Sequence, residues 1–195
     1  MKRRDLLKRT AAAMGTAVVA TRSVVTPAQQ VSGPTGTAQG GRRFRAFIRT
    51  AGGASVREVR LHPLRDDMVV IRTEATQCCY TIVNQALGTG DVGGAGGTVA
   101  ARILGHGGVG IVEAVGTTVK RVRPGDRVLV TNTPNCGECY DCLRGRGDIC
   151  QMNPATGEPL IPIGDLDDGT PVHQHNNTGG FAELMITYDC TACPR

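Results

Sequence analysis

The sequence predicts a mainly β protein, built as a small barrel or sandwich, and three observations lead to this prediction. From Phe44 onward the apolar residues come in short runs that are rich in Val and Ile and are separated by Gly, Pro and Asp. Glycine accounts for 27 of the 195 residues, about twice its usual share, which indicates many turns. Strands do not alternate with long helices, so a doubly wound α/β fold is not expected.

The first 28 residues are expected to be an export signal. The opening MKRRDLLKRT is basic, the following AAAMGTAVVAT is mildly apolar, and Thr26-Pro27-Ala28 supplies small residues at a cleavage site. The pair Arg3-Arg4 resembles the twin-arginine motif, which directs folded proteins out of the bacterial cytoplasm, so we expect a periplasmic location. An amphipathic N-terminal helix is the alternative; it explains the charges but not an apolar stretch that ends in small residues.

The net charge of +5 lies entirely in this first segment. Residues 1–28 contain six basic side chains and one acidic one, whereas the remaining 16 basic and 16 acidic side chains cancel. A neutral body lacks the basic surface that nucleic-acid binding requires, and aromatic residues are scarce at 3%. No apolar run has the length of about 18 residues that a membrane span needs. Nucleic-acid binding and integral membrane insertion are therefore both unexpected.

Residues 29–43 are expected to form a flexible linker, because they are rich in Gly, Thr, Ser and Gln. The folded domain is expected over residues 44–195. Its predicted strands, in chain order, are Phe44–Arg49, Val56–Leu61, Met68–Ala75, Val99–Leu104, Gly110–Val115, Arg127–Thr131 and Phe181–Thr187.

One helix and one well-defined turn complete the expected elements. The helix is Thr81–Leu87, with Thr81 as its N-cap and Gly88 as its end. The turn is Pro124-Gly125-Asp126, in which Pro fixes one backbone angle and Gly accepts a positive φ.

Two glycine-rich segments, Gly88–Gly93 and Gly105–Gly110, fit the pattern G-x-G-x-x-G. A dinucleotide site needs a strand before this pattern and a helix after it, so that the phosphates meet the N-terminus of the helix. More glycines follow the first segment, and a predicted strand follows the second. We therefore predict no nucleotide-binding residue in this chain.

The strongest signal is a cluster of four cysteines with the spacing C-x2-C-x2-C-x7-C, formed by Cys136, Cys139, Cys142 and Cys150. Four thiolates suit the closed tetrahedral shell of a structural zinc ion. Two disulfides are an alternative that an exported chain permits, and an iron–sulfur cluster is another. Export in the folded state favours zinc, because the metal can bind in the reducing cytoplasm.

Around this cluster the sequence resembles the zinc-dependent alcohol dehydrogenases of the medium-chain dehydrogenase/reductase family, in their N-terminal GroES-like catalytic domain. The family has the same cysteine spacing. Its zinc signature G-H-E-x2-G-x5-G-x2-V is matched by Gly105–Gly110, Gly116 and Val119, except at the Glu, and two further family motifs are matched by Pro124–Val128 and Gly179–Glu183. The resemblance implies a GroES-like barrel that carries a zinc-binding lobe.

The resemblance also implies a catalytic metal site. Cys79, with Thr81 two residues later, takes the position of the family's cysteine ligand, and His106 takes that of the zinc-binding histidine. Zinc held there would polarise an alcohol oxygen, and Thr81 would relay its proton. The preceding Cys78 is expected to be a small core residue that faces the other way.

Three departures from the family pattern bear on activity. Gly107 replaces the signature Glu, and Ile82 replaces the acid that orients the zinc-binding histidine; such losses typically cost 10–100-fold in metal affinity or activity. By resemblance, the third zinc ligand and the nicotinamide-binding Rossmann domain are expected beyond Arg195. The chain alone is therefore expected to bind catalytic zinc weakly, to bind neither NAD nor NADP, and to be inactive.

The remaining cysteine and histidine side chains are not assigned to a metal site. Cys190 and Cys193 are expected to be thiols in a frayed tail, and His62, His173 and His175 are expected to be exposed loop residues.

Two functions remain open at this stage. The first is the zinc-binding catalytic domain of an alcohol dehydrogenase, which in a full-length family member interconverts a small alcohol and an aldehyde with NAD or NADP. The second is a degenerate, non-enzymatic zinc-binding module with the same fold. A homo-oligomer is compatible with both.

Overall fold

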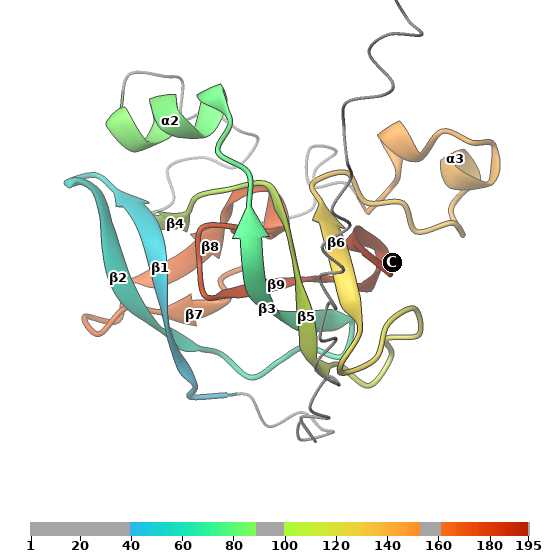
Figure 1. Ribbon diagram of the computed structural model, residues 1–195, viewed down its shortest axis with the longest axis horizontal. Coiled ribbons are helices and arrows are strands. Elements are labelled where there is room, and N and C mark those ends of the chain that lie inside the picture. Colours follow the sequence, from blue (N-terminus) through green and yellow to red (C-terminus); the bar gives the residue numbers. More distant parts are fainter. Residues whose placement is uncertain (1–39, 89–99, 153–160, 195) are drawn as a thin grey trace, which may run out of the picture. The chain divides into compact units, whose positions relative to one another are not determined.

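A computed structural model describes residues 40–88, 100–152 and 161–194 of the chain (Figure 1). The predicted signal over residues 1–28 and most of the predicted linker lie outside the described residues. The same is true of the glycine segment that begins at Gly88, apart from Gly88 itself. Within the described ranges, none of the helices has the length and apolar character needed to cross a bilayer.

Five strands close into a barrel in the order β1-β2-β7-β8-β4 (Figure 1). Neighbouring strands are antiparallel, except that β4 and β8 run parallel. Alternate side chains of these strands point inward, and Ile48, Val59 and Ile103 are fully buried in the barrel core. The strands are β1 (Arg43–Thr50), β2 (Gly53–Leu61), β4 (Ala101–Ile103), β7 (Gly164–Asp165) and β8 (Pro171–Gln174).

A second sheet has the strand order β10-β6-β5-β3-β9. Strand β3 lies between β5 and β9, and its first half is buried on both faces, because Val70 packs into the barrel core whereas Val69 and Ile71 pack into a separate cluster with Val112 and Met185. The strands are β3 (Met68–Thr76), β5 (Gly107–Val115), β6 (Arg127–Thr131), β9 (Leu184–Tyr188) and β10 (Ala192–Pro194).

The mainly β barrel is confirmed, and each of the seven predicted strands overlaps an observed one. The last predicted strand begins too early, because Phe181 is tied to the barrel by backbone hydrogen bonds to Leu104 and Phe47 before β9 starts. Strands β7, β8 and β10 were missed. The first two contain Gly, Asp and Pro, which a sequence assigns to turns rather than strands.

The second glycine segment leads into a strand, as predicted. Gly107 is already the first residue of β5, so no helix N-terminus follows the segment on which a pyrophosphate could rest.

Helix α2 (Tyr80–Leu87) confirms the predicted helix, but its cap differs from the prediction. Cys79 is the N-cap residue, with extended backbone, and Thr81 lies inside the first turn. The C-terminal end is as predicted: Gly88 adopts a left-handed conformation with φ of 72°, and its N–H bonds back to the carbonyls of Asn84 and Gln85. The Nη1 of Arg49, at the end of β1, donates to the carbonyl oxygen of Ala86 at 3.2 Å and so holds the helix against the barrel.

Replacing Gly88 by Ala is expected to lower the free energy of unfolding by about 1 kcal/mol, because a positive φ is sterically unfavourable for a residue with a Cβ. The added Cβ would also lie 2.7 Å from Arg49 Nη2 and displace that side chain from the helix end. Chemical denaturation measures the change. Gly52→Ala is the matched control, since its Cβ meets nothing nearer than 3.8 Å; equal effects of the two changes would contradict the prediction.

The expectation that Cys190 and Cys193 lie in a frayed tail is wrong. Residues Asp189–Thr191 form a short 3₁₀ turn, and β10 pairs with β6, with Cys193 opposite Leu129. Cys190 is buried, and the carboxylate of Asp189 accepts the backbone N–H groups of Lys120 and Arg121 at 3.1 and 3.2 Å. This segment is therefore packed into the fold, and it contacts the region that leads to the cysteine cluster.

Candidate functional site

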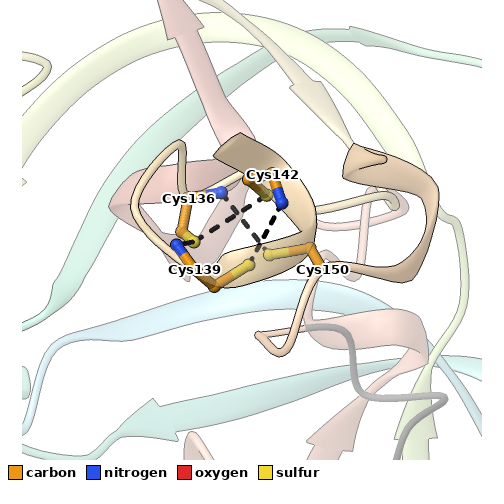
Figure 2. Close-up of side chains that lie close together, drawn as sticks. All are labelled: Cys136, Cys139, Cys142 and Cys150. Carbon is orange, nitrogen blue, oxygen red and sulfur yellow. Dashed lines mark hydrogen bonds between the residues drawn. The ribbon is translucent and has the colours of Figure 1, made fainter. Parts of the chain in front are cut away.

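The four cysteines of the predicted zinc site converge in a lobe between β6 and β7. Figure 2 shows their sulfur atoms pointing toward one another, and the four Sγ atoms all lie within 4.8 Å of each other. Cys136 Sγ and Cys142 Sγ are 3.9 Å apart. Four sulfurs at the usual Zn–S distance of about 2.3 Å form a tetrahedron with edges of about 3.8 Å, whereas bonded disulfide sulfurs are about 2.05 Å apart. The spacing fits a metal ion and not disulfides.

Backbone N–H groups in the lobe point at the sulfurs and favour the thiolate form. The N–H of Cys139 lies 3.3 Å from Cys136 Sγ, and the N–H of Cys142 lies 3.5 Å from Cys139 Sγ (Figure 2). The N–H groups of Gln151 and Cys142 lower the pKa of the Cys139 thiol to about 6. A backbone hydrogen bond from Gly137 also lowers the pKa of Cys142, but burial and the neighbouring thiols of Cys139, Cys150 and Cys136 together raise it to about 12. Cys139 is therefore the thiol of the cluster that is poised to bind a metal ion as a thiolate at neutral pH.

Short helical elements shape the lobe. Cys139 is the N-cap residue of helix α3 (Tyr140–Leu143), and Cys150 is the C-cap residue of a 3₁₀ turn, η1 (Gly147–Ile149). Gly145 joins them with a φ of 76°, a conformation that glycine adopts without a steric penalty.

Contacts from the rest of the domain fix the lobe at its first ligand. The guanidinium of Arg121 donates to the carbonyl oxygens of Asn135 at 2.8 Å and Cys136 at 2.5 Å. The N–H of Asn135 donates to the carbonyl oxygen of Cys190 at 3.3 Å. Burial, together with the nearby Cys150, raises the pKa of the Cys190 thiol to about 12, so this fifth cysteine stays protonated at neutral pH.

The second predicted pair, Cys79 and His106, is also brought together. Cys79 lies between the end of β3 and the start of α2, and His106 directly precedes β5, which pairs with β3. Cys79 Sγ and His106 Nε2 are 2.9 Å apart, and both side chains are half-buried. A thiol and an imidazole nitrogen that converge in this way could hold one side of a metal ion.

Gln77 also contacts His106, and the sequence analysis did not predict this contact. Its amide Nε2 lies 3.2 Å from Nδ1 of His106, on the opposite side of the ring from Cys79. A Cβ added at Gly107 would lie 3.4 Å from that amide nitrogen and 3.1 Å from the carbonyl oxygen of Val130. The missing side chain at position 107 thus leaves room for Gln77 to contact the ring.

The other side chains that the sequence analysis discussed near this pair differ in how exposed they are. Thr81 is exposed on the first turn of α2, two residues after Cys79. Ile82 is buried, so its position offers no carboxylate to His106. The expectation that Cys78 is a core residue is wrong: it is exposed, because β3 ends at Thr76 and the alternation of the strand does not extend to position 78.

The prediction that the remaining histidines are exposed loop residues is also wrong. His175 is buried, and its ring centroid lies 5.7 Å from that of His106. Burial, with the nearby His106 and Arg102, lowers the pKa of His175 to about 4, so its ring is neutral at pH 7. His173 lies in β8, and His62 is half-buried and pairs with Asp165 at 2.8 Å.

In the part of the chain that the structure describes, the four-cysteine lobe is the one place where three or more His, Cys, Asp or Glu side chains gather closely enough to share a metal ion. Among the described residues, Cys79 and His106 provide two donors of their own.

Comparisons with known proteins identify the family to which the fold belongs. A family model described as the alcohol dehydrogenase GroES-like domain matches residues 65–194. S-(hydroxymethyl)glutathione dehydrogenase of Paracoccus denitrificans is 32% identical over 151 residues, which are 74% of this chain and 39% of that protein. Alcohol dehydrogenase 6 of Rattus norvegicus is 33% identical over 135 residues, 68% of this chain and 35% of that protein.

Solved structures show the same similarity. The crystal structure of an alcohol dehydrogenase zinc-binding domain protein from Burkholderia ambifaria has a TM-score of 0.61 and 30% identity, and the match covers 78% of this chain and 42% of that one. The chain spans about two fifths of the length of these relatives. The family match shows that the chain belongs to the family of alcohol dehydrogenase GroES-like domains, and its barrel and cysteine lobe are consistent with this.

Proposed function

We propose that this chain is the zinc-binding catalytic domain of an alcohol dehydrogenase, and that the whole enzyme interconverts a small alcohol and its aldehyde with NAD or NADP. The observation that carries the proposal is the approach of Cys79 Sγ to His106 Nε2 at 2.9 Å, with Gln77 on the other ring nitrogen. Its relatives include dehydrogenases of alcohols and of S-(hydroxymethyl)glutathione.

In this proposal Cys79 and His106 hold a catalytic zinc ion, which when bound supplies a Lewis acid for the alcohol oxygen. Gln77 fixes the ring of His106. In the structure the amide nitrogen of Gln77 lies nearest Nδ1. Rotating the amide by half a turn would bring its oxygen there instead, so that Gln77 accepts the Nδ1–H and the Nε2 lone pair is free for the metal. Thr81, exposed beside Cys79, carries the alcohol proton to solvent.

The four-cysteine lobe has a separate, structural role in the proposal. Cys136, Cys139, Cys142 and Cys150 would hold a zinc ion with no open position, since all four of its ligands are protein thiolates. Such an ion would order residues 136–150 and would take no part in the chemistry.

A second candidate function, a zinc-binding module without enzymatic activity, is favoured by two positions. Gly107 and Ile82 stand where the family resemblance implies acidic side chains, and the buried Ile82 cannot replace a carboxylate. Gln77 on His106 favours the enzyme, because a module that holds only structural zinc has no need to orient this ring.

Cobalt substitution separates the two functions. We expect the metal-free chain to take up a first Co²⁺ in the lobe, with strong thiolate-to-cobalt absorption, and a second, weaker Co²⁺ whose visible spectrum changes when propan-1-ol is added. Cys79→Ser should abolish the second event. Cys78→Ser is the matched control and should retain it, because Cys78 is exposed and adjacent. A wild-type chain that binds one cobalt ion, or a second ion insensitive to alcohol, would support the module.

We also propose export through the twin-arginine pair Arg3-Arg4. Changing both residues to Lys is expected to reduce the periplasmic fraction of the full chain to the background level, because the export machinery reads the guanidinium pair. Fractionation and immunoblotting measure this, with Arg22→Lys as the control outside the pair. Unchanged periplasmic accumulation of the double variant would contradict the proposal.

A further inference from the structure

The side chains of Cys79, His106 and Gln77 form a row of contacts that also suits chemistry without a metal ion. Cys79 Sγ lies 2.9 Å from Nε2 of His106, and the amide of Gln77 lies 3.2 Å from Nδ1 of the same ring. The first distance is within the reach that proton transfer to a general base requires. A thiol, an imidazole and an amide in this order are the parts of a nucleophilic triad.

Cys79 also lies at the N-terminal end of a helix. It is the N-cap residue of α2, and its side chain makes no capping hydrogen bond. The first backbone bonds of the helix run from the N–H groups of Ile82 and Val83 to the carbonyl oxygen of Cys79. The N–H groups of Tyr80 and Thr81 precede this pattern and have no acceptor within the helix. Such groups stabilise negative charge, as on the oxyanion that forms when a thiol attacks a carbonyl carbon.

We propose that Cys79 and His106, while no metal ion is bound to them, hydrolyse small activated esters and thioesters. Cys79 is the nucleophile and His106 the general base. Gln77 is a positioning residue: after a half-turn of its amide it accepts the Nδ1–H, so that Nε2 takes the thiol proton. This activity goes beyond the proposed dehydrogenase, and the two exclude each other, because a metal ion takes the same sulfur and nitrogen.

The reaction has two steps, both without a change of oxidation state. In the first, the Sγ–H proton of Cys79 passes to Nε2 of His106 and Sγ attacks the carbonyl carbon of the ester. The bond to the leaving group breaks, the leaving group takes the proton from His106, and the acyl group stays on Cys79 as a thioester. In the second, His106 takes a proton from water, the water oxygen attacks the thioester, and the C–S bond breaks. Sγ recovers the proton as the carboxylic acid leaves.

The position of the pair favours small and reactive substrates. Cys79 and His106 are half-buried, whereas the adjacent Cys78 and Tyr80 are exposed, so the sulfur lies close to the surface. A shallow site supplies little binding energy, and a good leaving group, such as a nitrophenol or a thiol, compensates for this.

The test is acetylation of the full chain by p-nitrophenyl acetate, followed at each cysteine by mass spectrometry. One equivalent of zinc is added first, to fill the four-thiolate lobe in preference to the two-donor pair. We expect Cys79 to be acetylated about 100-fold faster than Cys78 and Cys193, because a positioned general base contributes about 10²–10⁴-fold. Those two thiols are exposed, and the described part of the chain shows no histidine partner for either.

Release of p-nitrophenolate should show a burst of about one equivalent per chain and then a slower steady rate. Excess zinc should suppress acetylation of Cys79 and leave that of Cys78 unchanged. Equal acetylation rates at Cys79 and Cys78, or an acetyl group on Cys79 that water does not remove, would overturn the proposal. Both comparisons are made within the wild-type chain and do not depend on the folding of a variant.

Variants assign the roles. His106→Ala should lower the acetylation rate of Cys79 to that of Cys78, and an unchanged rate would overturn the role of His106 as the base. Gln77→Ala should lower the rate and Gln77→Glu should restore it, whereas His62→Ala, in the pair with Asp165, is the control and should keep it. If the pair binds cobalt but Cys79 reacts like Cys78, only this inference fails. If Cys79 reacts as expected but the pair binds no metal, only the proposed dehydrogenase fails.

Discussion

Replacing Cys139 by Ser is expected to abolish zinc binding in the four-cysteine lobe and to unfold residues 136–150. The Sγ of Cys139 accepts the N–H of Cys142, and Cys139 is the N-cap residue of helix α3. Structural zinc binds thiolate peptides with an apparent free energy of about 10–16 kcal/mol, and this energy is coupled to folding. Elemental analysis should show the loss of one zinc per chain, and limited proteolysis should show cleavage within the lobe.

Cys193→Ser is the matched control for this change. Cys193 is an exposed thiol on β10, outside the cluster, so its replacement should leave zinc content and protease resistance unchanged. A Cys139→Ser chain that retains the full zinc content and an intact lobe would show that the four cysteines do not act as one metal site.

Replacing Gln77 by Ala is expected to weaken metal binding at Cys79 and His106 by about 10–100-fold, the usual effect of removing a hydrogen bond from a metal-binding histidine. Competition with a chromophoric chelator measures the affinity. Metal held in the cysteine lobe is the internal control and should be unaffected. Gln77→Glu should restore the affinity, because a carboxylate accepts the Nδ1–H of His106 at least as well as an amide. Equal affinities of the wild type and the Ala variant would exclude a role for Gln77 in orienting the ring.

Much of the fold could be predicted from local pattern. Strands β3 and β6 are apolar runs bounded by turn residues, and their observed ranges nearly coincide with the predicted ones. The end of α2 at Gly88 follows from the backbone freedom of glycine. Short strands such as β7, a Gly-Asp pair held only by its neighbours, have no local signal and depend on tertiary pairing.

The candidate sites were likewise predictable where the pattern is local and not where it depends on tertiary contacts. The lobe was predictable because its four ligands lie within fifteen residues, so that spacing alone defines a shell. Gln77 and His106 are 29 residues apart and meet only because β3 pairs with β5. The sequence analysis noted that Gly107 lacks the family's acid, but it assigned no partner to His106 in its place. His175 gave no hint, since its burial depends on the packing of the turn His175–Asn177 against Gly105.

X-ray absorption at the zinc K-edge, on chain purified without added metal, tests the cysteine lobe most directly. The lobe geometry predicts at least one zinc per chain with four sulfur neighbours at about 2.3 Å. The observed sulfur positions match that shell. All four Sγ atoms lie within 4.8 Å of one another, and those of Cys136 and Cys142 are 3.9 Å apart. A folded chain without zinc, or a tightly bound ion with mainly nitrogen and oxygen neighbours, would contradict the assignment.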